Sequence, residues 1–135
     1  TSSVPRLINV RGFHGSGKVE RPETKIYPGA NRTNADYYKN LKAQSWGNLR
    51  RLFRETFRAR SEPGYNYDPS QIISLCSKMP MLNKLTTELS QPTWEPDNTG
   101  KMIVDKQPDD SKSPNLADAV MMVKSGARRR MIINR

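Results

Sequence analysis

Apolar positions recur with two different periods along this chain, and together they predict a mixed α/β fold. Over 34–60 the spacing is helical, and Thr33 or Asn34 is suited to cap the start of the helix. Residues 7–10 instead form a short run rich in branched side chains, typical of a strand. The apolar stripe of the long helix consists of Tyr38, Leu41, Trp46, Leu49, Phe53 and Phe57. We expect this stripe to face the core.

The rest of the chain predicts shorter elements. Residues 72–76 have the composition of a short buried strand, and 82–89 have the spacing of a short helix. Extended runs at 92–95 and 101–106 flank an Asn/Gly turn, which predicts a β-hairpin. A final helix is expected from Pro114 to about Lys124, with Ser113 as its cap and Ser125–Gly126 as its stop.

These elements divide one expected domain, 1–135, into consecutive parts. The parts are a strand and loop (1–32), the long helix (33–60), short elements with the hairpin (61–112), the final helix (113–125) and a basic tail (126–135). The chain opens at Thr1 directly into the strand-like run, which fits a piece of a longer protein.

The charge balance points to a polyanionic partner. There are 23 Lys and Arg against 13 Asp and Glu, a formal net charge of +10. Such an excess favours DNA or RNA, although a basic chain that is merely well solvated has the same composition. No apolar run approaches the roughly 20 residues that a membrane-spanning helix needs, so no membrane association is expected.

Several kinds of catalytic site are disfavoured because the chain has too few cysteine and histidine residues. The chain has one cysteine, Cys76, and one histidine, His14, too few for a zinc site or a convincing nucleophile–base pair. We expect Cys76 to be buried and inert, in a reducing compartment.

A glycine-rich segment, 12–18, has the spacing of a phosphate-binding P-loop. Val19 follows Lys18 where that motif needs Ser or Thr for magnesium, and Pro22 opposes an immediate helix. A loop without phosphate-binding function is the better interpretation.

Carboxylate chemistry with a divalent metal remains. Asp118 is the leading candidate, because it lies early in the final helix between Ala117 and Ala119, which leave room for a metal and a phosphate. An ordinary acid of an amphipathic helix has the same pattern. Arg50, Arg54 and Arg58, at i, i+4 and i+8, share one face of the long helix. That row is either a solvated flank or a contact to the DNA backbone.

Four segments, in order, resemble the nuclease domain of tailed-bacteriophage terminase large subunits. They are Asn-Leu-Lys-Ala-Gln-Ser-Trp at 40–46 with Leu49, Arg50 and Phe53; Leu-Thr-Thr-Glu-Leu-Ser-Gln-Pro-Thr at 85–93; Gly-Lys-Met-Ile-Val-Asp-Lys at 100–106; and Ser-Pro-Asn-Leu-Ala-Asp-Ala-Val at 113–120. The similarity spans about 33–123. It implies the C-terminal part of a ribonuclease-H-like domain, with a mixed sheet flanked by helices and a β-hairpin.

The resemblance also implies roles for particular residues. Asp118 would be the last carboxylate of a site for two Mg²⁺ or Mn²⁺ ions, and Asn115 would lie near that metal. Lys101 and Lys106 of the hairpin would lie near the DNA. The other acids would lie upstream of Thr1, preceded by a packaging ATPase, so the chain alone would carry an incomplete, inactive site.

The function implied is metal-dependent cleavage of concatemeric double-stranded DNA during genome packaging, in the cytoplasm of the infected bacterial host. Double-stranded DNA, the terminase small subunit and the portal protein would be the partners. The alternative is a non-enzymatic basic module that binds nucleic acid or another virion protein. It explains the charge without explaining the ordered similarity.

Overall fold

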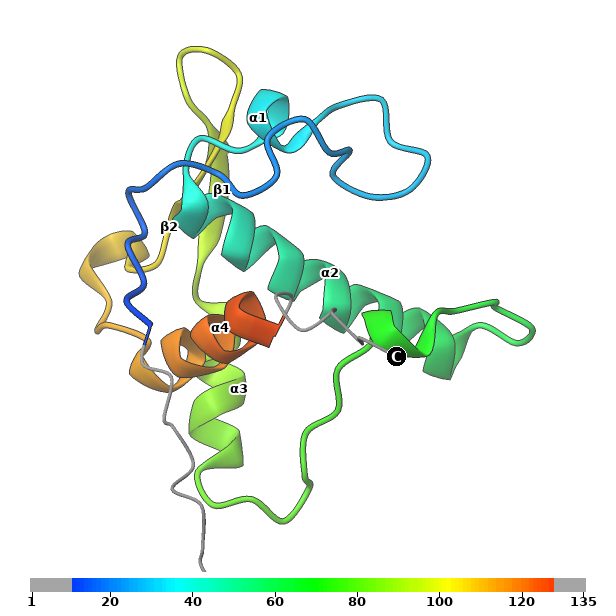
Figure 1. Cartoon of the computed structure of the whole chain (residues 1–135). Helices are drawn as coiled ribbons and strands as arrows, with labels where there is room; N and C mark the ends of the chain where they lie inside the picture. The colour runs from blue at the N-terminus through cyan, green and yellow to red at the C-terminus, as the bar shows by residue number, and fades with distance from the viewer. Residues whose placement is uncertain (1–10, 128–135) are drawn as a thin grey trace, which may run out of the picture.

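The computed structural model describes residues 11–127 of the chain, with helices gathered around one β-hairpin (Figure 1). The elements in order are α1 (Asn34–Tyr37), α2 (Leu41–Ser61), η1 (Pro69–Gln71), α3 (Leu82–Ser90), β1 (Thr93–Pro96), β2 (Met102–Asp105), η2 (Pro108–Asp110) and α4 (Asn115–Ala127). This bears out the predicted mixture of helices with a β-hairpin. The strand predicted at 7–10 and most of the basic tail lie outside the described residues.

The single helix predicted over 34–60 is wrong, because the chain breaks between α1 and α2. Thr33 caps α1, and its side chain and that of Asp36 form a reciprocal capping box. At the break the Lys39 N–H donates to the Met102 carbonyl of β2 at 3.0 Å instead of continuing the helix. The Asn40 side chain then accepts from the first turn of α2. Pairing with the hairpin therefore interrupts a segment whose apolar spacing is continuous.

The core lies where α2, α3, α4 and β2 meet. Its buried members include Trp46, Leu49, Leu85, Val104 and Met121. The predicted stripe is confirmed for Tyr38, Trp46 and Leu49, which are buried in the core. Leu52 is buried although the stripe omitted it, and Phe57 is 69% exposed although the stripe included it. Figure 1 shows the reason: the C-terminal end of α2 extends away from the hairpin and α4.

The predicted hairpin is confirmed. β1 and β2 pair antiparallel, with Trp94 opposite Val104, and Gly100 takes a positive φ of 79° in the turn. The Asp97 carboxylate accepts from the backbone N–H groups of Thr99 and Lys101, and it forms an ion pair with Lys39 at 2.9 Å. The turn is thus closed internally and fastened to the α1–α2 break.

The strand predicted at 72–76 is wrong. The segment is extended but unpaired with any described strand, because Ile73 bonds through both backbone groups to the Thr56 hydroxyl of α2. Ile73 is buried, whereas Cys76 is exposed, so the expectation of a buried thiol is also wrong.

The helices predicted at 82–89 and from Pro114 are both present. However, α4 continues through Ser125 and Gly126 instead of stopping there. Ser125 donates its hydroxyl to the Met122 carbonyl, which satisfies the side chain within the helix. No helix among residues 11–127 is long and apolar enough to cross a membrane.

Candidate active site

Asp118 lies in the first turn of α4, on the side that faces the hairpin. Ala117 and Met121 are fully buried in the core, and they fix the orientation of this helix. The Asp118 residue is itself only 9% exposed. The sequence thus places a carboxylate at the edge of the packed face.

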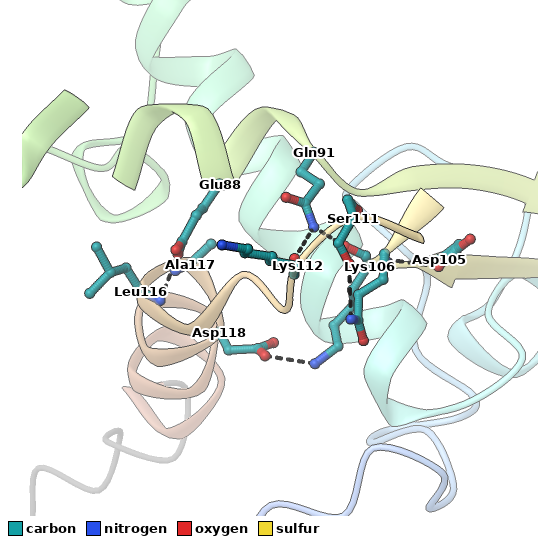
Figure 2. Close-up of polar contacts among 10 residues, drawn as sticks. Glu88, Gln91, Asp105, Lys106, Ser111, Lys112, Leu116, Ala117 and Asp118 are labelled. Carbon is teal, nitrogen blue, oxygen red and sulfur yellow. Dashed lines mark hydrogen bonds and ion pairs between the residues drawn. The ribbon is translucent and has the colours of Figure 1, made fainter. Parts of the chain in front are cut away.

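The structure brings two of the predicted site residues together. Lys106, directly after β2, places its Nζ 2.6 Å from Asp118 Oδ2 (Figure 2). The two side chains are 26% and 13% exposed, so this is a partly buried ion pair. The predicted position of Lys106 near the DNA path stays a prediction; in the structure its ammonium group contacts the candidate metal ligand.

The second carboxylate oxygen of Asp118, Oδ1, is buried and has no hydrogen-bond partner among the described residues. A buried acceptor without a partner costs free energy, which fits an atom that receives a ligand. In residues 11–127 no group of three or more His, Cys, Asp or Glu side chains surrounds it. Asn115, expected nearby, is exposed. The described residues therefore fit one ligand of a divalent metal and do not form a complete set.

Glu88 of α3 and Gln91, the C-cap of that helix, contact the segments that carry this pair, and neither was predicted as a site residue. Glu88 accepts from the backbone N–H groups of Leu116 and Ala117 at 2.7 and 3.1 Å. Gln91 donates through Nε2 to the carbonyls of Lys106 and Lys112 at 2.6 and 2.7 Å. Figure 2 shows both side chains reaching across from α3. The available signal was Glu88 itself, an acid one helical turn after Leu85 on the apolar side of α3.

The expected DNA-contacting residues fall into two situations. Arg50 and Arg54 are exposed on α2. Arg58 is already engaged, because its guanidinium bonds to Glu62 and lies 4.1 Å from the centre of the Tyr65 ring. These bonds to Glu62 raise the pKa of Arg58.

Lys101 lies at the start of the second hairpin arm, and its backbone N–H bonds to Asp97. Within the described chain, no side-chain bond joins Arg50, Arg54 or Lys101 to Asp118.

The glycine-rich loop has the wrong polarity for a phosphate. The carbonyls of Gly15 and Gly17 accept from the N–H groups of Lys42 and Leu41 at 2.8 and 2.9 Å. A phosphate needs N–H donors pointing inward, whereas this loop presents carbonyls to the N-terminus of α2. The loop therefore accepts hydrogen bonds from the start of α2, in agreement with the prediction of a loop without phosphate-binding function.

Comparisons with solved structures place this geometry in a known context. The nuclease domain of the large terminase subunit gp2 of bacterial virus Sf6 matches with a TM-score of 0.72 and 33% sequence identity. The match covers 82% of this chain and 50% of that one.

A lysine-to-alanine variant of the Sf6 domain with manganese and β-thujaplicinol matches with a TM-score of 0.70 and 33% identity, over the same shares of each chain, 82% and 50%. The variant with calcium matches at 0.68, with the same identity and coverage.

No protein-family model matches the chain, and no curated protein matches it by sequence. The chain spans half the length of the solved domains that it matches. The chain is therefore similar in sequence and in structure to part of the nuclease domain of a phage terminase large subunit, and its fold matches a partial ribonuclease-H-like nuclease domain.

Proposed function

We propose that this chain is part of a metal-dependent DNA endonuclease in a phage packaging terminase, with Asp118 as one of its metal-binding carboxylates. The observation that carries the proposal is the state of that side chain. Asp118 is buried, Oδ2 is paired with Lys106, and Oδ1 is left without a partner among the described residues. A carboxylate held in this way is prepared to bind a cation through Oδ1.

The metal would be Mg²⁺ or Mn²⁺; calcium and manganese accompany variants of the Sf6 domain. When bound, a pair of such ions supplies Lewis-acid activation of water and stabilisation of the leaving oxygen. Asp118 would hold the ions on one side. The remaining carboxylates would come from upstream of Thr1, in the part of the matched domain that this chain does not span.

Lys106 would contribute charge at the same place. Its ammonium group lies against Asp118 Oδ2, so a positive charge is present where the phosphodiester must approach. A lysine at this distance offsets the negative charge of the carboxylate, which otherwise repels the DNA backbone.

DNA binding would be carried by cations away from this pair. Arg50 and Arg54 project from α2, and Lys101 lies on the hairpin. Such residues contact phosphates with little base readout, so binding would weaken steeply with salt. Through the whole enzyme, the partners would be concatemeric double-stranded DNA, the small subunit and the portal protein, in the cytoplasm of the infected host.

The test is Asp118→Asn in the intact terminase large subunit, with Asp109→Asn as its control. Asp109 is exposed and lies in the same connection between β2 and α4, so the control makes the same charge change nearby. Asp118→Asn should abolish metal-dependent cleavage and leave DNA binding nearly unchanged, whereas Asp109→Asn should cut normally. Normal cleavage by Asp118→Asn would refute the assignment.

A thermal-shift measurement with Mn²⁺ separates the two classes of function. The intact enzyme should gain stability from Mn²⁺, and Asp118→Asn should lose most of that gain, because ligand binding to the folded state raises its stability. If neither protein responds and neither cuts, the chain is better described as a basic nucleic-acid-binding module.

A further inference from the structure

Glu88 is a buried acid of α3 whose carboxylate bonds to the first turn of α4. It is 9% exposed, and Oε2 accepts from the N–H groups of Leu116 and Ala117 (Figure 2). Backbone N–H groups at the start of a helix lack partners within the helix. The other two in this turn bond to the carbonyls of Ser113 and Pro114. Glu88 therefore completes the N-terminus of α4 from a different helix.

Gln91 lies one helical turn further along and fastens the chain on the other side of the pair. Its Nε2 group has two N–H donors, and it contacts two carbonyls, those of Lys106 and Lys112. These residues stand at the two ends of the connection between β2 and α4. A single amide thus closes the loop that separates Lys106 from the helix carrying Asp118.

We propose that Glu88 and Gln91 are positioning residues that set the Lys106–Asp118 geometry; this rests on the proposed role of Asp118 as a metal ligand. Glu88 fixes the first turn of α4, where Asp118 lies, and Gln91 fixes the main chain of Lys106. Neither side chain contacts the carboxylate or the ammonium group of the pair. They act through the backbone, and a shift of about 1 Å at a reacting group is enough to cost two orders of magnitude in rate.

The chemistry of each side chain makes the proposal specific. Glu88 must accept two bonds at a positively polarised helix end, so Glu88→Gln keeps the shape while removing the charge and adding donors. Gln91 must donate twice, so Gln91→Met keeps the length and removes both donors. Glu88→Asp keeps the carboxylate on a shorter stem. Glu23→Gln, on an exposed loop, is the matched control for loss of one acidic charge.

The first readout is independent of cleavage. NMR detects the scalar coupling across the hydrogen bond between Lys106 Nζ and the Asp118 carboxyl, and Lys106→Met identifies the signal. In the intact protein we expect this coupling to be lost in Glu88→Gln and in Gln91→Met, and to persist in Glu23→Gln. If Glu88→Gln fails to fold, Gln91→Met decides the outcome alone. Persistence of the coupling in the folded variants overturns the proposal.

The second readout is the kinetics of metal-dependent cleavage. Both variants should lower kcat by about 10-fold to 100-fold, as is typical when a group that orients a metal ligand is removed. The KM for DNA should not change, since the phosphate-contacting cations are untouched, and Glu88→Asp should recover part of kcat. A role limited to stability predicts instead that kcat recovers when the assay temperature is lowered, and that result would also overturn the proposal.

The two hypotheses fail in different ways. If Asp118→Asn cuts normally, the proposed function is wrong, while the coupling experiment still decides whether Glu88 and Gln91 position the pair. If Asp118→Asn is inactive but Glu88→Gln and Gln91→Met have unchanged kcat and coupling, the function stands and the positioning role is refuted.

Discussion

Gly47 offers a quantitative test of how closely the hairpin packs on α2. It lies within that helix, where alanine is favoured over glycine by about 1 kcal/mol. A Cβ at this position would come 2.6 Å from the Trp94 ring and 2.7 Å from the Tyr38 ring. The two rings already contact each other, with centroids 6.2 Å apart, and Tyr38 is buried. Because Tyr38 is buried, its ring has little room to move away.

The expected effect of Gly47→Ala is therefore a loss of stability despite the better helix former. Overpacking of this kind costs about 1–3 kcal/mol, and two rings in conflict place this site in the upper half of the range. After subtracting about 1 kcal/mol for helix propensity, the net loss is about 1–2 kcal/mol. For a domain of this size, that lowers Tm by about 4–8 °C.

The assay is thermal unfolding followed by circular dichroism, with Asn48→Ala as the control. Asn48 is the next residue of α2, is only partly buried, and should gain about 0.5 kcal/mol from alanine. A double-mutant cycle with Trp94→Leu should reduce the penalty of Gly47→Ala, because the nearest ring is removed. If Gly47→Ala raises Tm as Asn48→Ala does, the close approach is not present in the protein.

Three further predictions concern charged and ionisable groups. The hydroxyl of Thr99 donates to Asp97 and holds the pKa of that carboxyl well below its usual range. The contribution of the Asp97 carboxylate to the free energy of unfolding is then complete above about pH 4 and is lost as the pH falls further. In Asp97→Asn, the loss of stability on acidification should be smaller by this contribution. The Glu55 carboxylate raises the pKa of Tyr65, which donates to it. That stabilisation is present below about pH 10 and is lost as the pH rises through the folded pKa; alkaline unfolding should become less steep in Tyr65→Phe, and unchanged steepness would contradict the bond. Arg54→Ala should reduce the slope of log binding constant against log salt by about 0.9 if Arg54 contacts one phosphate of duplex DNA, and an unchanged slope excludes that contact.

The elements that depend on neighbouring residues were predictable from the sequence. The hairpin follows from the Asn/Gly turn between two extended runs, and the final helix follows from Ser113–Pro114 before an apolar pattern. For the hairpin the deciding interactions lie within a few residues of one another, whereas the N–H groups of Leu116 and Ala117 in α4 bond to Glu88 of α3 and not to the side chain of the predicted Ser113 cap. The stop at Gly126 was misplaced because glycine ends a helix only where the backbone takes a positive φ, whereas Gly126 remains helical.

The errors arise where distant contacts override local patterns. The helical spacing of apolar residues continues on both sides of Lys39. The N–H of Lys39 nevertheless bonds to the carbonyl of Met102, more than sixty positions away in the chain. Asn40 could have indicated a new helix start, since asparagine is a good helix cap, but the apolar periodicity favoured one continuous helix. Phe57 keeps the helical spacing and is nevertheless exposed, because the C-terminal end of α2 extends away from the hairpin and α4.

At the candidate site the sequence indicated a residue but not its surroundings. Asp118 could be selected from its small neighbours and from the resemblance, whereas its pairing with Lys106 depends on how the connection between β2 and α4 folds back. That path is set by Gln91, which contacts only backbone carbonyls and therefore leaves no pattern in the residues that it joins. Backbone contacts of this kind are invisible to any argument from side-chain type.

The charge arrangement at Asp118 explains how this buried carboxylate, the proposed metal ligand, is compensated although the described residues supply no further metal-binding acids around it. An ionised group this deeply buried is unstable unless a counter-charge or hydrogen bonds compensate it. Lys106 supplies the counter-charge at Oδ2 only, and the main-chain bonds from Glu88 and Gln91 hold both segments in place. Oδ1 is consequently left free for a ligand while the side chain remains compensated. An ionised carboxylate with one compensated oxygen and one open oxygen supports the proposed role of Asp118 as a metal ligand.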